Sequence, residues 1–453
     1  MKARGGWESL SLFKAFTANK SLLVNAGSLV SSLGVSAGLG FVYWWVAARY
    51  FAKSEVGLAS ALIAAMNLLG AFGIVGLGTL LMGKLARQNQ ATYSRSTLIV
   101  TALLVAAVVS ATLGLVFVLL APRVSSEFRV LSERWDLALS FVFGVAISGV
   151  TLVLDQAVIG LLRGGLQFWR NVIFAVVKLV LVVVVGLWWF GGKDAAAIYN
   201  TWTLGNLVSL CGFAVLSWRS GLRMRTWRPN LGLLRALPGE ALRHHVLNLA
   251  LQTNALVLPV VVLVLLGAQV NASFAVAWLL ASFVSTIPFS LGMALYAVGS
   301  RTGQSDLAQK IRLSLRLSTG VAVIANIGLW LGADVIIGIF GPAYRDQAPW
   351  ALRLLTLAVF PIIVKDHFIA IRRVSGRMVQ TAGMAAIGGS LELSGAVIGG
   401  LVGGLYGLCI GRCVGFCLEA LLMGREVFEV AGGGIRSPKV SIGVESVSRI
   451  SSV

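Results

Sequence analysis

The sequence predicts an all-α polytopic membrane protein with about 12 transmembrane helices in two six-helix bundles and both termini cytoplasmic. Of its 453 residues, 57% are hydrophobic and only 12% are charged. Apolar runs of about 20 residues recur along the chain, and a helix of that length crosses about 30 Å of hydrocarbon. A helix is suited to this solvent because it satisfies its own backbone hydrogen bonds.

Twelve apolar segments are long enough to span. The first six are predicted at 22–48, 57–81, 96–120, 137–161, 171–190 and 195–217, and the second six at 244–267, 272–298, 313–340, 349–370, 378–402 and 404–423.

The distribution of Lys and Arg predicts the topology. With the N-terminus inside, 27 of the 37 Lys and Arg are assigned to the cytoplasmic side, in the N-terminal segment, the even-numbered loops with the adjoining span ends, and the tail, and 7 lie in the odd-numbered loops. The other three, Lys178, Arg353 and Arg412, are assigned to spans. Positive charge accumulates on the cytoplasmic side, and one missed helix would invert every later loop.

These boundaries predict five regions. Transporters are often built from two halves with the substrate site between them, although two unrelated halves would show the same pattern. The N-terminal leader fits either an interfacial helix or a flexible segment. The regions are a leader at 1–21, a six-helix bundle at 22–217, a basic cytoplasmic linker at 218–243, a second six-helix bundle at 244–423 and a disordered cytoplasmic tail at 424–453.

Composition and motifs argue against several other functions. The net charge of +20 lies in short loops beside spans, and no basic domain is large enough to bind nucleic acid. Cys409, Cys413 and Cys417 follow one helix face, which favours a packing stripe over a metal site. There is no phosphate-binding Gly-rich loop, zinc-ligand spacing or Gly-x-Ser-x-Gly elbow. We therefore predict no enzyme activity, cofactor or metal.

Opposite charges within adjacent spans suggest ion pairs. Asp155 and Lys178 lie equally far from a turn predicted at 166–167, so an antiparallel hairpin would place them at one depth. Glu392 and Arg412 are related in the same way to the glycines after Val402. Such pairs either reduce the cost of inserting charge or line a transport cavity.

Polar and small residues also follow helix faces. Asn248, Gln252 and Asn254 lie on span 7 with Pro259, and Asn25 lies early in span 1. These side chains either line a cavity or make interhelical hydrogen bonds, each worth about 0.6 kcal/mol. Close packing is predicted for a run of glycines spaced by four, namely Gly395, Gly399, Gly403, Gly407, Gly411 and Gly415.

Two segments resemble a known family. They are Val42–Phe51 (VYWWVAARYF) followed by Glu55-Val56-Gly57, and Gly76-Leu77-Gly78 leading to Lys84 and Arg87. They are similar to the start of Wzx-like oligosaccharide flippases, in the superfamily that also holds lipid II flippases and multidrug and toxin extruders. The span count and the division into two sets of six are also similar, although some relatives have 14 spans.

The resemblance implies that a polyprenyl-diphosphate-linked oligosaccharide crosses the inner (cytoplasmic) membrane by alternating access, for surface polysaccharide synthesis. The implied partners are that lipid-linked substrate, membrane lipids, a polysaccharide polymerase and glycosyltransferases. A cation-coupled drug or metabolite exporter and a membrane-embedded enzyme of polysaccharide assembly remain alternatives.

The resemblance also suggests site residues. Arg49 matches the arginine at the end of the family's first span, which implies contact with the diphosphate; the alternative is an interfacial anchor beside aromatic residues. Cations attract a diphosphate, and guanidinium groups offer it forked donors. The expected substrate-binding residues are Arg49, Asn25, Lys178, Gln252, Asn254 and Arg412, and the expected proton- or cation-coupling residues are Asp155, Glu392 and Glu419.

Reporter fusions test the predicted topology. Green fluorescent protein fused to the C-terminus should fluoresce, and alkaline phosphatase at the same point should be inactive, because both report a cytoplasmic site. A phosphatase fused after Val402 should be active, since that turn is predicted outside. Active phosphatase at the C-terminus would contradict the predicted orientation.

Overall fold

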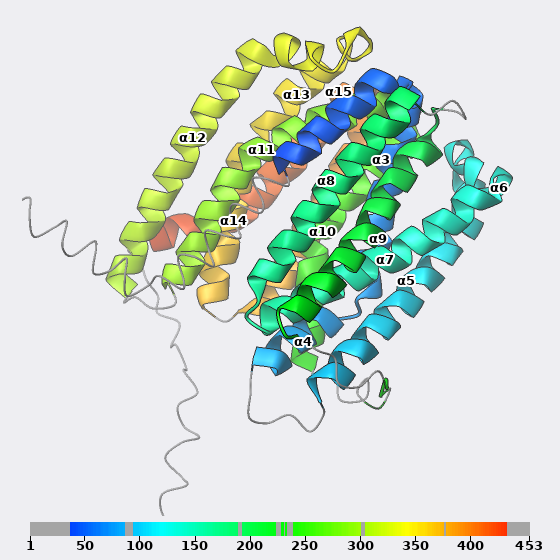
Figure 1. Ribbon diagram of the computed structural model, residues 1–453. Helices are drawn as coiled ribbons and strands as arrows, with labels where there is room; N and C mark the ends of the chain where they lie inside the picture. The colour runs from blue at the N-terminus through cyan, green and yellow to red at the C-terminus, as the bar shows by residue number, and fades with distance from the viewer. Residues whose placement is uncertain are drawn as a thin grey trace, which may run out of the picture. The chain divides into compact units, whose positions relative to one another are not determined.

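The computed structural model describes residues 37–86, 94–188, 193–222, 228–230, 232, 239–299, 304–375 and 377–432. Every regular element within these ranges is a helix (Figure 1). Ten helical segments among them are long and apolar enough to cross a membrane. The prediction of an all-α polytopic membrane protein is therefore confirmed. The leader, Asn25 and the tail beyond residue 432 lie outside the described residues.

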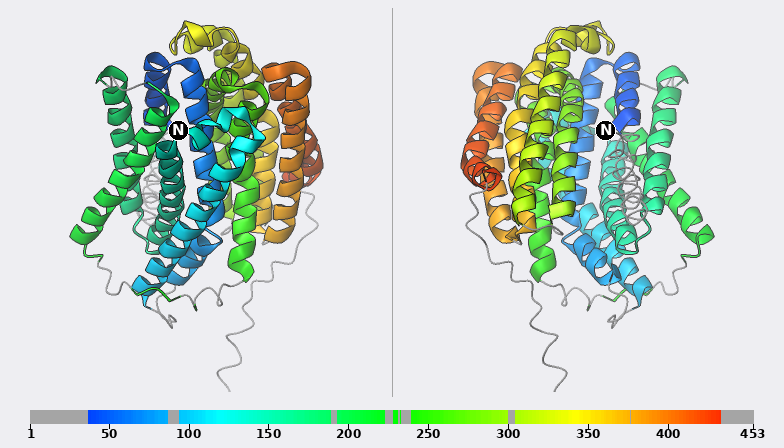
Figure 2. Two further views of the ribbon diagram at one scale, coloured as in Figure 1. Left: turned by 90° about the vertical axis from the view of Figure 1, so that its right-hand side faces the viewer. Right: turned by 90° about the vertical axis from the view of Figure 1, so that its left-hand side faces the viewer.

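The described chain forms two compact units. Unit 1 comprises the residues up to Leu279 together with Asp334–Pro349, and unit 2 comprises Leu280–Ala333 together with the residues from Trp350. Within each unit the helices run side by side (Figure 2). The segment Asp334–Pro349 thus belongs to unit 1, although the chain on both sides of it belongs to unit 2.

Unit 1 contains the described part of the first span, residues 37–50, and most of the helices that follow. Within it α5 packs along α7, and α8 packs along α9 (Figure 1). Its helices are α3 (Lys53–Gly73), α4 (Leu77–Ala86), α5 (Arg95–Val124), α6 (Val130–Glu133), α7 (Trp135–Gly160), α8 (Gly164–Trp188), α9 (Ala195–Arg219), α10 (Gly239–Leu266) and the first part of α11 (Ala268–Gly299).

The second predicted span is broken rather than continuous. It divides into α3 and α4, because Val75 and Gly76 adopt positive φ angles of 46° and 77°. Glycine adopts this conformation readily, whereas a β-branched residue does so rarely. The Gly76-Leu77-Gly78 motif therefore marks a helix break, which a membrane protein tolerates where the backbone is covered by neighbouring helices.

Small residues bring α3, α5 and α7 close together. A Cβ atom added to Gly73 would lie 1.9 Å from Ser110 Oγ, and one added to Gly149 would lie 2.1 Å from the same atom. No side chain fits at either position. These glycines therefore set the spacing of the three helices, as small residues do in membrane bundles.

Residues 244–279, which the sequence assigns to the second bundle, pack in unit 1. Gly57 of α3 meets the start of α11 so closely that an added Cβ would lie 1.8 Å from Ala268 O. Asn271 Nδ2 donates to Gly57 O at 2.7 Å and to Ser60 Oγ at 3.0 Å. α10 also contacts α3. The grouping therefore rests on a close backbone approach fixed by a buried amide.

Unit 2 contains the rest of α11, most of α12 (Gln304–Gly338) and α13 (Ala348–Leu357), α14 (Val359–Val374) and α15 (Met378–Ala431). α15 is a hairpin, because Gly403 and Gly404 leave the helical conformation and Gly404 has a φ of 56°. We call residues 378–402 its first arm and 405–431 its second arm. The arms match the two predicted spans, and the second arm continues eight residues beyond the predicted end at 423.

The glycine stripe joins the two arms of this hairpin. A Cβ on Gly399 would lie 2.0 Å from Gly407 O, and one on Gly395 would lie 2.3 Å from Gly411 O. The backbones therefore touch at both levels, and close packing is confirmed at these four glycines, whereas Gly403 lies at the turn with nothing within 4 Å of an added Cβ.

Gly399→Ala should destabilise this hairpin by roughly 1–3 kcal/mol, because the added methyl group meets a backbone carbonyl that cannot move aside. Thermal unfolding in detergent measures the effect. Gly383→Ala is the matched control on the same arm, since nothing lies within 4 Å of its added Cβ. Equal melting temperatures for the two variants would contradict the packing.

Candidate functional site

The first buried ion pair in unit 1 joins α7 to α8. Arg170 donates two hydrogen bonds to Asp155, from Nε at 2.8 Å and from Nη2 at 2.6 Å. The guanidinium also donates to Asn171 Oδ1 at 2.6 Å, and Arg170 is only 5% exposed. Both charges are therefore neutralised locally in a forked geometry, which is the strongest arrangement for such a pair.

The predicted pairing of Asp155 with Lys178 is wrong, because the turn was placed too late. α7 ends at Gly160 and α8 begins at Gly164, so the turn centres on Leu162, which has a φ of 57°. Arg170 then lies eight residues beyond Leu162, close to the seven by which Asp155 precedes it. Equal distance from the turn predicts the partner correctly once the turn is located.

Lys178 instead lies among aromatic rings. Its Nζ stands 3.5 Å from the ring centroid of Trp202, 4.5 Å from that of Phe174 and 5.1 Å from that of Tyr43. The residue is 4% exposed, and within the described part of the chain no carboxylate pairs with it. Cation–π contacts offset part of the cost of burial, by about 2 kcal/mol when desolvated. No carboxylate of the described residues would balance an ammonium charge at this position.

Arg49 makes a hydrogen bond within unit 1. Its Nε and the indole Nε1 of Trp45 both donate to Ile339 O at 2.9 Å. Lys53 Nζ donates to Ala343 O at 2.8 Å. These three side chains fasten the end of the first span to the segment Asp334–Pro349. The contact agrees with the structural alternative for Arg49; its contact with substrate stays a prediction.

Unit 2 holds a cluster of four buried ionisable groups. Lys365 Nζ lies 2.7 Å from Glu392 Oε1 and 2.9 Å from Glu419 Oε2. Arg412 Nη2 lies 3.9 Å from Glu392 Oε2. The Glu392–Arg412 pair is therefore confirmed across the hairpin of α15, and α14 contributes a second cation to it.

Lys365 is not among the site residues predicted from the sequence, because it was assigned to the cytoplasmic side although it lies within the predicted span 349–370. In the structure it lies midway along α14, with its side chain 13% exposed. The predicted bounds of that span already place Lys365 within the membrane. What the sequence could not show is that one ammonium group serves two glutamates from two different arms.

The polar stripe on α10 is only partly buried. Gln252 is exposed and Asn254 is half-buried, with Pro259 inside the helix. Their roles in binding substrate stay predictions, as does that of Asn25.

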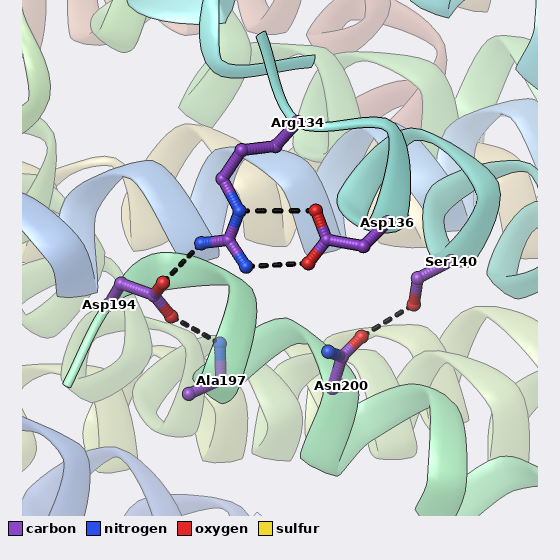
Figure 3. A network of polar contacts seen from close by, with 6 residues as sticks. All are labelled: Arg134, Asp136, Ser140, Asp194, Ala197 and Asn200. Atoms are coloured by element: carbon purple, nitrogen blue, oxygen red, sulfur yellow. Dashed lines mark hydrogen bonds and ion pairs between the residues drawn. The ribbon is translucent and has the colours of Figure 1, made fainter. Parts of the chain in front are cut away.

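A polar network at one end of unit 1 joins α7 to α9 (Figure 3). The Arg134 guanidinium bridges Asp136 and Asp194, and Asp194 Oδ1 accepts from Ala197 N at 2.9 Å and so caps α9. Glu55 Oε2 accepts from Ala195 N at 2.7 Å. These carboxylates accept from N–H groups at the start of α9, and Glu55 holds the start of α3 beside it.

Within the described residues, no group of three or more His, Cys, Asp or Glu side chains could hold a metal ion. Cys413 Sγ donates to Leu354 O at 3.2 Å, and Cys409 is buried. Cys413 therefore packs against α13, whereas Cys417 is exposed.

No family model and no curated protein matches this chain. Solved structures do. The inward-facing conformation of a multidrug resistance MATE family transporter of the MOP superfamily superposes with a TM-score of 0.67 at 16% identity, over 89% of this chain and 96% of that chain. A MATE transporter in complex with MaL6 gives 0.63 at 13% identity, over 90% and 96%. The outward-facing conformation of a MATE family transporter gives 0.58 at 13%, over 92% and 96%.

At these identities the likeness shows the fold. The chain has the fold of MATE transporters, whose 12 helices agree with the 12 spans that the sequence predicts.

Two substitutions test which cation balances Asp155. Arg170→Met should destabilise the protein by roughly 3–5 kcal/mol, because it leaves a buried carboxylate without its partner. Lys178→Met should leave the stability unchanged or raise it, since a similar apolar side chain replaces an uncompensated charge. Thermal unfolding of both variants in detergent measures these stabilities. A larger loss of stability in Lys178→Met than in Arg170→Met would support the Asp155–Lys178 pair instead.

Proposed function

We propose that this chain is a membrane transporter working by alternating access, and that it moves a polyprenyl-diphosphate-linked oligosaccharide across the cytoplasmic membrane. The fold of MATE transporters supports the first part. The second part rests on the chemistry of the buried cations. A polysaccharide polymerase and glycosyltransferases would then act on either side of this step.

One observation carries the choice of an anionic substrate, namely the uncompensated charge of Lys178. Burying a cation in an apolar interior is costly unless an opposite charge balances it, and such residues usually mark a substrate or ion pathway. The aromatic rings around Lys178 exclude water and leave its charge unsatisfied. A diphosphate group supplies the missing negative charge.

The other two candidate cations are already engaged. Arg49 donates to the carbonyl group of Ile339, and Arg412 faces Glu392. Binding a diphosphate would require each of them to give up an existing partner. Lys178 needs no such exchange, so we place the first contact with the diphosphate there.

The coupling candidates also differ. Both oxygens of Asp155 are held by Arg170, which is the geometry of a structural ion pair. Glu392 and Glu419 share one lysine, and sharing makes their ionisation interdependent. We therefore propose that these two glutamates, rather than Asp155, couple transport to a cation gradient.

A cation-coupled exporter of drugs or metabolites is the second candidate. The solved structures with this fold are described as multidrug resistance transporters, which favours it. A cationic drug would be repelled by Lys178, so this candidate predicts that removing the lysine improves transport. The lipid-linked substrate predicts the opposite.

Lys178→Met should lower the flipping of a fluorescent lipid-linked oligosaccharide in proteoliposomes by about tenfold or more, equivalent to about 1.4 kcal/mol of lost substrate binding. Lys193→Met is the matched control, because Lys193 also stands over an aromatic ring, 5.8 Å from Tyr50, but is exposed. Unchanged flipping in the Lys178 variant would refute the assignment. In cells, loss of the protein should leave lipid-linked oligosaccharide on the inner leaflet.

A further inference from the structure

The charge cluster of unit 2 leaves one carboxylate oxygen unused. Glu419 is 1% exposed, and its Oε2 contacts Lys365 at 2.9 Å. Its Oε1 is buried and accepts no hydrogen bond from any described residue. That oxygen lies against the first arm at Gly388, where an added Cβ would come within 2.1 Å of it. The fold thus leaves space for the Glu419 carboxyl group, but the described residues provide no hydrogen-bond donor to its Oε1.

The surrounding charges are distributed unevenly. Glu392 contacts two cations, Lys365 at 2.7 Å and Arg412 at 3.9 Å. Glu419 contacts only Lys365 among the described cations, and it shares that ammonium group with Glu392. Arg412 acts on Glu419 more weakly than on Glu392. Glu419 is therefore the less compensated of the two carboxylates.

The remaining ionisable neighbour is Asp366 on α14. Its Oδ2 is also buried without a hydrogen bond, but two cations, Lys365 and Arg373, act on its charge. Glu419 has a second carboxylate beside it instead. Two carboxylates at one site do not readily ionise together, and the less compensated one takes the proton.

We propose that Glu419 holds an exchangeable proton. Lys365 forms ion pairs with Glu392 and Glu419 when Glu419 is ionised, and with Glu392 alone when Glu419 is protonated. The inference deepens the proposed function, on which it rests, by naming the coupling ion. A proton from water converts the Glu419 carboxylate to a neutral carboxyl group, which then donates to the Glu392 carboxylate. Lys365 keeps its bond to Glu392 and loses its ion pair with Glu419. The link between α14 and the second arm is thereby weakened.

A neighbouring pair shows the contrast. Arg372 and Glu426 lie seven residues beyond Lys365 and Glu419 on the same two helices, and join them in the same way. Here the arginine pairs with one carboxylate, although its Nη1 also donates to Gln380 Oε1 at 2.9 Å, and the Glu426 side chain is 28% exposed. Glu426 needs no proton, so it is a matched control for Glu419.

Infrared difference spectroscopy of the purified full-length protein in lipid nanodiscs tests the proton site without any substrate. Lowering the pH should produce the carbonyl band of a protonated carboxyl group. Glu419→Gln should abolish that band, and Glu426→Gln should leave it. Lys365→Met should move its midpoint to higher pH, since the carboxylate loses the cation that favours ionisation.

Persistence of the band in Glu419→Gln, or its loss in Asp366→Asn, would overturn the assignment. Glu419→Asp, which keeps the acid, should retain a shifted band and serves if the Gln variant does not fold. In proteoliposomes, an imposed pH gradient should change the rate of flipping by the unaltered protein but not the rate of flipping by the Glu419→Gln variant. A titrating band in a protein that moves no lipid-linked oligosaccharide would refute the substrate and leave the proton site standing.

Discussion

Burying a charge in an apolar helix bundle costs free energy, and an opposite charge at a similar depth offsets that cost in both units. Asp155 and Arg170 meet across the turn between α7 and α8. Glu392 and Arg412 meet across the hairpin of α15. In both cases the partners lie at similar distances from a turn, because antiparallel helices bring such positions to similar depths. Breaking one partner leaves the other buried and unpaired, which costs several kcal/mol.

The glycines make these contacts possible. An added Cβ on Gly415 would lie 2.6 Å from the Cα of Glu392, so the two arms of α15 touch at the level of the charge cluster. Gly388 provides the space that the Glu419 carboxyl group fills. The stripe of small residues and the buried charges are therefore parts of one arrangement. Larger residues would separate the arms and leave the charges too far apart to neutralise one another.

The two buried lysines show how surroundings determine what one residue type can do. Lys178 lies over aromatic faces, and no carboxylate of the described residues pairs with it. Lys365 is shared by two glutamates, and its charge is already matched. The fold alone does not decide what chemistry these two positions carry, because one fold supports many functions. The substrate has to be argued from the environment of each cation.

Composition and spacing alone determined the fold class, the number of spans and the α15 hairpin, because hydrophobic length and a glycine repeat are properties of a single segment. The Glu392–Arg412 pair followed because two glycines mark that turn. Tertiary structure alone decided that Arg170 balances Asp155, that Lys365 joins two glutamates, and that Arg49 binds the carbonyl of Ile339. A turn misplaced by four residues shifts the predicted partner by about two helical turns, and contacts between distant segments leave no periodic signal in the chain.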